Sequence, residues 1–74
     1  MERQQVSSSN IRSIGYDMTN ETLEVEFHSG GIYQYLNVPE PVYSELMSAS
    51  SKGSYLNNQI KKQFQFRKIR WNVA

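Results

Sequence analysis

The residues best suited to chemistry lie in one stretch, "SSKGSYLNNQIKKQFQFRKIR", which mixes cations, side-chain amides and aromatic rings. Cations neutralise phosphate, amides reach sugars or base edges, and aromatic rings stack on unpaired bases. Backbone amides at a helix start near Ser51–Gly53 could also hold an anion. This pattern indicates a nucleic-acid surface, and its candidate residues are Lys52, Asn57, Asn58, Lys61, Lys62, Arg67, Lys68, Arg70 and Trp71.

Packing is the alternative for the apolar part of this stretch. Tyr55, Leu56, Ile60 and Phe64 could cover a sheet, and asparagine side chains often bond to local backbone. On that interpretation the cations form only a solvated face.

Catalytic and metal-binding patterns are absent from the sequence. His28 is the only imidazole and falls at the tip of an expected hairpin, where a solvated turn residue is the simpler interpretation. Glu24 and Glu26 have no second cluster of ligands and fit the wet side of an amphipathic strand. The chain has no cysteine and no phosphate-binding loop with the required spacing. We therefore expect no enzyme activity, no metal and no cofactor.

Charge is divided unevenly along the 74 residues. Residues 1–45 hold seven carboxylates and two arginines, a balance of −5, whereas residues 46–74 hold six cations and no carboxylate, a balance of +6. Such a division fits a nucleic-acid surface, an acidic partner or self-association, and it also arises from ordinary solvated faces.

Hydrophobic periodicity predicts an α+β fold in a single domain, residues 11–74, after a flexible tail at residues 1–10. A three-stranded antiparallel meander is expected over about residues 11–38, because "LEVEFH" alternates apolar and polar residues and turn sequences flank it. Two short helices, one beginning near Pro41 and one capped by Ser51, should cover one face. A short edge strand could follow residue 64. The expected core is Ile14, Leu23, Val25, Phe27, Tyr33, Tyr35, Val42, Leu46, Leu56 and Ile60.

Tyr33 and Tyr35 could form either a binding platform or part of the core, and the hairpin register decides between them. A three-residue loop at His28–Gly30 pairs Val25 with Tyr33 and puts both rings on the apolar face. A two-residue loop would instead put the rings beside Glu24 and Glu26, where carboxylates repel phosphate. We predict the first register and burial of both rings.

The order of "VEFHSGGIYQYLNVP", "VYSELMSASSKGSYLNNQI" and an aromatic, basic ending resembles the KTSC domain. The likeness runs from Ile11 to about Ile69 and includes the Tyr-x-Tyr pair. It implies a small module that occurs alone in bacterial and phage proteins and at the C-terminus of some lysyl-tRNA synthetases. That attachment suggests RNA binding, and it carries over no catalytic residue.

A protein-interaction module is the rival function. The chain could form a homodimer or dock on a larger protein through a free strand edge or through Phe66, Ile69 and Trp71, because so small a core gains stability by association. The sequence contains no apolar run long enough for a membrane span and no apolar signal core at its start, so a cytoplasmic protein is expected.

Overall fold

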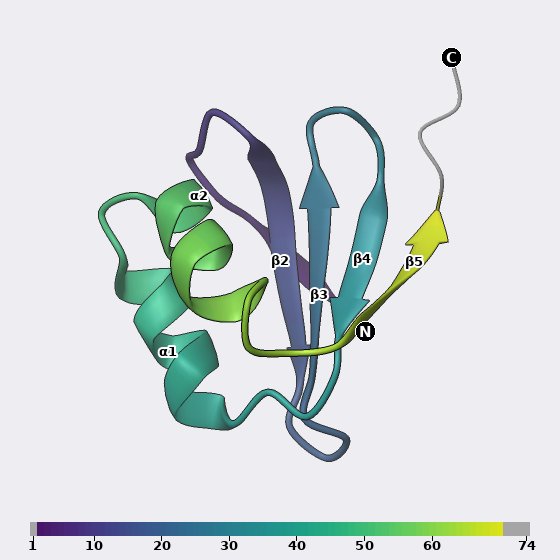
Figure 1. Ribbon diagram of the computed structural model, residues 1–74. Helices are drawn as coiled ribbons and strands as arrows, with labels where there is room; N and C mark the ends of the chain where they lie inside the picture. The colour runs from purple at the N-terminus through teal and green to yellow at the C-terminus, as the bar shows by residue number, and fades with distance from the viewer. Residues whose placement is uncertain (1, 71–74) are drawn as a thin grey trace.

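The computed structural model describes residues 2–70 and contains a five-stranded antiparallel sheet with helices on one face (Figure 1). Neighbouring strands follow chain order: β1 (Arg3–Gln5), β2 (Ile11–Asp17), β3 (Thr22–Phe27), β4 (Ile32–Tyr35) and β5 (Phe66–Arg70). Between β4 and β5 the chain forms α1 (Glu40–Ser48), α2 (Lys52–Tyr55) and the π-helical segment η1 (Leu56–Ile60). No helix within residues 2–70 is long and apolar enough to cross a bilayer.

The predicted three-stranded meander is wrong, because the sheet has two further strands, β1 beside β2 and β5 beside β4. β1 comes from the segment expected to be a tail, and its Gln4 pairs with Ile14 of β2. Its sequence, "RQQ", has no apolar alternation, so the periodicity that identified the other strands could not detect it. β5 is the edge strand considered after residue 64, and its Phe66 pairs with Tyr35. The α+β class itself is confirmed.

Gly15 permits β1 to lie close to β2. A Cβ atom at Gly15 would sit 2.5 Å from the backbone oxygen of Glu2 and 3.0 Å from the Cγ of Arg3. Real Cβ atoms essentially never lie closer than 3.0 Å to another atom, so the 2.5 Å distance shows that this glycine marks a close backbone approach.

The β3–β4 hairpin has the predicted register. Val25 pairs with Tyr33, and the Phe27 amide donates to the Gly31 oxygen at 3.0 Å. Gly30 takes a φ of 104°, which a side chain would disfavour. Both tyrosines therefore share the helix-covered face with Val25.

The core lies between that face and the helices. Nine side chains in it are at most 1% exposed: Ile11, Ile14, Leu23, Val25, Tyr35, Val38, Leu46, Leu56 and Ile60. Seven of the ten predicted core residues are among them. The other three, Phe27, Tyr33 and Val42, pack against the core but are only partly buried.

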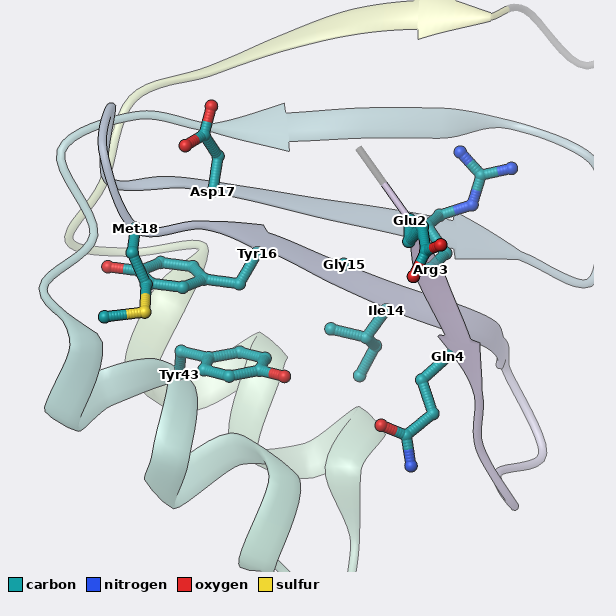
Figure 2. A pocket seen from close by; sticks show the side chains of 9 residues that line it. All are labelled: Glu2, Arg3, Gln4, Ile14, Gly15, Tyr16, Asp17, Met18 and Tyr43. Atoms are coloured by element: carbon teal, nitrogen blue, oxygen red, sulfur yellow. The ribbon is translucent and has the colours of Figure 1, made fainter.

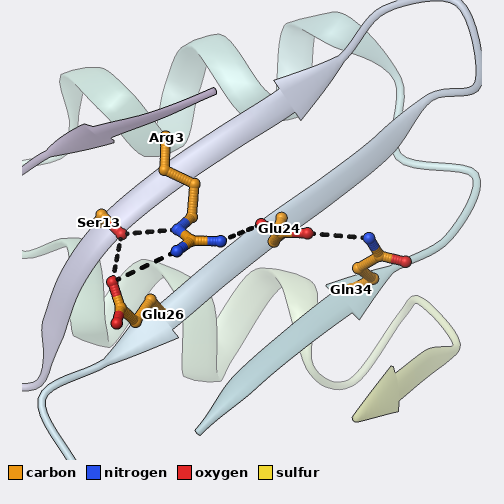
Figure 3. Close-up of polar contacts among 5 residues, drawn as sticks. All are labelled: Arg3, Ser13, Glu24, Glu26 and Gln34. Carbon is orange, nitrogen blue, oxygen red and sulfur yellow. Dashed lines mark hydrogen bonds and ion pairs between the residues drawn. The ribbon is translucent and has the colours of Figure 1, made fainter. Parts of the chain in front are cut away.

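Polar side chains join the strands on the opposite face (Figure 3). Arg3 of β1 forms an ion pair with Glu24, donates from Nε to the Ser13 Oγ at 3.0 Å, and lies 3.8 Å from Glu26. Gln34 of β4 donates to the second Glu24 oxygen at 2.9 Å. Glu24 is only 5% exposed, so its predicted place on a wet face is wrong: β1 and its arginine cover it.

Candidate functional site

Four aromatic rings form a row on the helix side of β3, β4 and β5. We call Phe27, Tyr33, Tyr35 and Phe66 the aromatic row. Ring centroids are 5.4 Å apart for Phe27 and Tyr33, and 5.5 Å apart for Tyr33 and Phe66. Tyr35 lies 5.8 Å from Phe66 and is buried, whereas Phe66 is 55% exposed. The row therefore runs from the core to the surface. Its four rings share one face because the register puts them at alternate positions of adjacent strands.

Two lysines lie over this row. The Lys61 Nζ is 5.4 Å from the Phe27 ring centroid, and the Lys68 Nζ is 5.2 Å from the Tyr33 centroid. Each distance falls within the range of a cation–π contact. Lys61 follows η1 and Lys68 lies on β5, so segments from both sides of the row supply its charge.

The helix before Lys61 differs from the predicted one. Ser51 caps it as expected, its Oγ accepting from the Ser54 amide at 3.3 Å. After one turn, however, the hydrogen bonding changes to the π pattern, and the Lys61 amide donates to the Leu56 oxygen at 2.9 Å. Such segments are frequent at functional sites. Here it buries Leu56 and leaves Asn57 exposed beside Lys61, in a groove of about 270 Å³.

The structure brings together only part of the predicted site. Lys61, Lys68 and Asn57 lie at or beside the aromatic row. Arg67 binds the Gln34 Oε1 at 2.9 Å, in the polar network of the other face. Strand alternation explains this split, since neighbouring residues of β5 point to opposite faces.

The remaining candidates are dispersed. Lys52 donates to the Ala49 oxygen at 3.3 Å, and Lys62 is exposed. Asn58 lines a separate groove with Tyr55 and Gln59. Arg70 pairs through its backbone with Ile32, and Trp71 lies outside the described residues.

Sequence reasoning did not consider Phe27 as a surface group, and it considered Tyr33 for a binding platform but rejected that alternative. It placed both in the core because they share a face with Val25, yet neither is fully buried. Their positions in the strands could have indicated this: Phe27 is the last residue of β3 before the hairpin loop, and Tyr33 is the second residue of β4 after it. Helices that pack on a sheet can leave the side chains at the ends of its strands uncovered.

Figure 2 shows the side chains that line a second groove, and its charged groups are Glu2, Arg3 and Asp17. It measures about 560 Å³, lies between β1, β2 and α1, and is lined in part by Gln4, Ile14, Tyr16, Asp17, Met18 and Tyr43. The Tyr16 and Tyr43 rings stack with centroids 4.6 Å apart. Burial raises the pKa of Tyr16, and the negative charges of Glu21, Glu40 and Asp17 raise it further. The Arg3 guanidinium of this lining is paired with Glu24, so the net charge around the groove is negative and disfavours phosphate.

The pKa values of two other tyrosine hydroxyls are also raised. Burial, with a smaller effect of Tyr33, raises the pKa of Tyr35 to about 12. A hydrogen bond to Glu45, 2.6 Å long, raises the pKa of Tyr55 to about 12. Both hydroxyls therefore stay neutral to a higher pH than that of an ordinary tyrosine. Within residues 2–70 no three His, Cys, Asp or Glu side chains are grouped as a metal site requires.

Comparison with known proteins identifies the family. A family model described as the KTSC domain matches residues 7–64. This chain belongs to the KTSC domain family. The crystal structure of a KTSC domain protein from Yersinia pestis superposes with a TM-score of 0.90 at 52% identity, covering 93% of this chain and 97% of that one. The resemblance inferred from the sequence is thus confirmed.

KTSC relatives differ greatly in length. An uncharacterized protein of Stutzerimonas stutzeri is 44% identical over 63 residues, which cover 85% of this chain and 89% of the relative. A lysine–tRNA ligase of Nostoc sp. is 44% identical over 59 residues, which cover 80% of this chain but 10% of the ligase. The same domain therefore matches a protein of similar size and a small part of a much larger one.

Proposed function

We propose that this KTSC domain is a small non-catalytic module that binds single-stranded RNA weakly through the aromatic row, Lys61 and Lys68. One observation carries the proposal: two ammonium groups lie over the rings of a partly exposed aromatic row. Unpaired bases stack on such rings, and the adjacent cations neutralise their phosphates. The match to part of a lysine–tRNA ligase supports RNA rather than another polyanion by association.

Charge distribution supports the same surface. The carboxylates nearest in sequence to Phe27, those of Glu24 and Glu26, lie on the opposite face, where Arg3 contacts both. Asp17, Glu21 and Glu40 act on Tyr16, at the acidic groove. The aromatic row can therefore present positive charge to an anion.

Exposed predicted cations such as Lys62 contribute longer-range attraction in this proposal, whereas Arg67 belongs to the polar face. Contacts from Arg70 and stacking by Trp71 stay predictions. Binding by ring stacking and charge neutralisation requires no catalytic group.

Fluorescence anisotropy with a labelled oligouridine RNA of about eight nucleotides tests the proposal. Phe66→Leu keeps an apolar side chain but removes the ring, and it should weaken binding by about 1 to 3 kcal/mol. Lys61→Ala should weaken binding and reduce the salt slope by about 0.7, the value for one phosphate of a single strand. Arg12→Ala is the matched control, since Arg12 is an exposed cation beside Ser13 and Glu26 on the other face.

Equal losses for Lys61→Ala and Arg12→Ala would contradict the assigned surface. They would mean that net charge, not position, controls the affinity. Absence of binding by the unmodified protein at high concentration and low salt would end the RNA proposal itself.

Self-association is a second candidate function, favoured by β5. This strand is one of the two outer strands of the sheet, and in it Phe66 is 55% and Ile69 46% exposed. An apolar contact between copies should respond little to salt, whereas phosphate binding weakens steeply. Sedimentation over a range of protein concentrations tests it: a dimer that Ile69→Asp abolishes supports it, and a monomer at every concentration excludes it.

A further inference from the structure

We infer that a groove lined by hydroxyl and amide groups continues the aromatic row and holds the sugar–phosphate backbone of nucleotides next to the stacked ones. The inference rests on the proposed function and goes beyond it, because it assigns a backbone-binding path that none of the stacking residues provides. It concerns the end of the sheet where the β1–β2 loop meets α2 and η1.

Two hollows at this end form one path. The first, of about 270 Å³, includes Phe27 and Lys61 of the candidate surface among its lining residues. The second, of about 320 Å³, is lined by residues of the β1–β2 loop and of the α1–α2 turn. Both are lined by Asn10, Gly53 and Asn57, so the second begins where the first ends.

The lining chemistry favours an anionic backbone with hydroxyl groups. Serines 7–9 and 50, 51 and 54 line the second hollow together with Lys52. Among residues 2–70, no carboxylate lines either hollow. Hydroxyl and amide groups donate to phosphate oxygens and can donate to or accept from a ribose hydroxyl. Among residues 2–70, two rings line the path, those of Phe27 and His28, and both belong to the first hollow. The second hollow therefore offers no ring on which bases could stack.

Hydrogen bonds hold the path in shape before any ligand binds. The Ser8 Oγ accepts from the Asn10 and Ile11 amides, each at 3.3 Å, and the Ser8 backbone oxygen lies 3.0 Å from the His28 Nε2. Across the path, a Cβ atom at Gly53 would lie 3.5 Å from the Asn10 Nδ2. Any side chain at Gly53 would therefore narrow the path where its two halves meet.

Two neighbouring asparagines of the π segment face different hollows. Asn57 and Asn58 are both exposed, yet Asn57 lines both hollows of the path and Asn58 lines a different one. Replacing either by leucine changes polarity and volume equally. This pair provides a matched test, with Asn58→Leu as the control.

The experiment uses three labelled RNA probes. One is a short oligouridine of about four nucleotides, and the others carry abasic ribose phosphates at the 5′ or the 3′ end. We expect one extension to raise the affinity of the unmodified protein and to steepen its salt slope by about 0.7 to 1.4, which corresponds to one or two phosphates. Asn57→Leu should abolish that gain, and Asn58→Leu should keep it. Thermal melting of both variants checks that they fold.

Two results would overturn the inference alone. If neither extension raises affinity while the unextended uridines still bind, the path is not used and the stacking surface remains. The same conclusion follows if both variants lose the gain equally. If the unextended uridines do not bind at all, the proposed function fails and the path fails with it.

Discussion

Removing the Arg3 side chain tests whether β1 belongs to the folded unit. In Arg3→Ala the Glu24 carboxylate loses its ion pair while its side chain is only 7% exposed, and the Gln34 amide remains as a donor. Loss of one partner of a buried pair costs about 3 to 5 kcal/mol. Because the Arg3 side chain is 27% exposed, water can replace part of the contact, and about 2 to 3 kcal/mol is the expected loss.

That loss is large for so small a domain. A chain of this length has a free energy of unfolding of about 4 to 11 kcal/mol. The melting temperature should therefore fall by about 10 to 20 °C. Adding Glu24→Gln to Arg3→Ala should recover much of the stability, because the glutamine keeps a hydrogen bond to Gln34 without the buried charge.

Thermal melting followed by circular dichroism measures the effect, and Gln5→Ala is the control on the same strand. Gln5 is exposed, and its replacement should change the free energy by no more than about 0.5 kcal/mol. Equal melting of Arg3→Ala and Gln5→Ala would refute the reasoning and place β1 outside the cooperative unit.

Three further predictions concern packing and ionisation. Gly15→Ala should destabilise the domain by about 1 to 3 kcal/mol in urea unfolding, because the added Cβ collides with the Glu2 backbone; an unchanged midpoint would count against the close approach. Tyr35→Ala should lose about 3 kcal/mol, since its ring is 1% exposed, whereas Tyr35→Phe should keep most of the stability; equal losses would argue against cavity formation. Stability should fall as the pH rises from about 10 to about 12, because the unfolded chain ionises its tyrosines before Tyr35 and Tyr55 ionise in the folded protein, and Tyr35→Phe should lessen the fall. Unfolding measured at a series of pH values would contradict this if the two proteins showed the same slope.

Local chemistry made part of the fold predictable. The stretch "HSGG", with Gly30 at a positive φ, determines a three-residue loop. That loop pairs Val25 with Tyr33 and so determines the face on which Tyr35 lies. Ser51 was recognisable as a cap from its residue type and position. These features depend on residues close together in the chain.

Long-range contacts made the rest unpredictable. β1 has no apolar pattern of its own and is held by Gly15 and by the pairing of Arg3 with Glu24, twenty-one positions away. In the same way, the basic segment appeared to be one surface in the linear sequence, although alternation along β5 separates Arg67 from Lys68. Tyr33 was assigned to the right face, but only the arrangement of the helices determines how far that face is covered.

Chemical-shift mapping by NMR tests the central claim most directly, with isotope-labelled protein and unlabelled oligouridine at low salt. Binding through the aromatic row predicts saturable shifts of Phe27, Tyr33, Lys61 and Phe66, with little change at Ser13 and Arg12 on the opposite face. Shifts confined to the polar face would contradict that claim, as would spectra that respond to protein concentration and not to RNA.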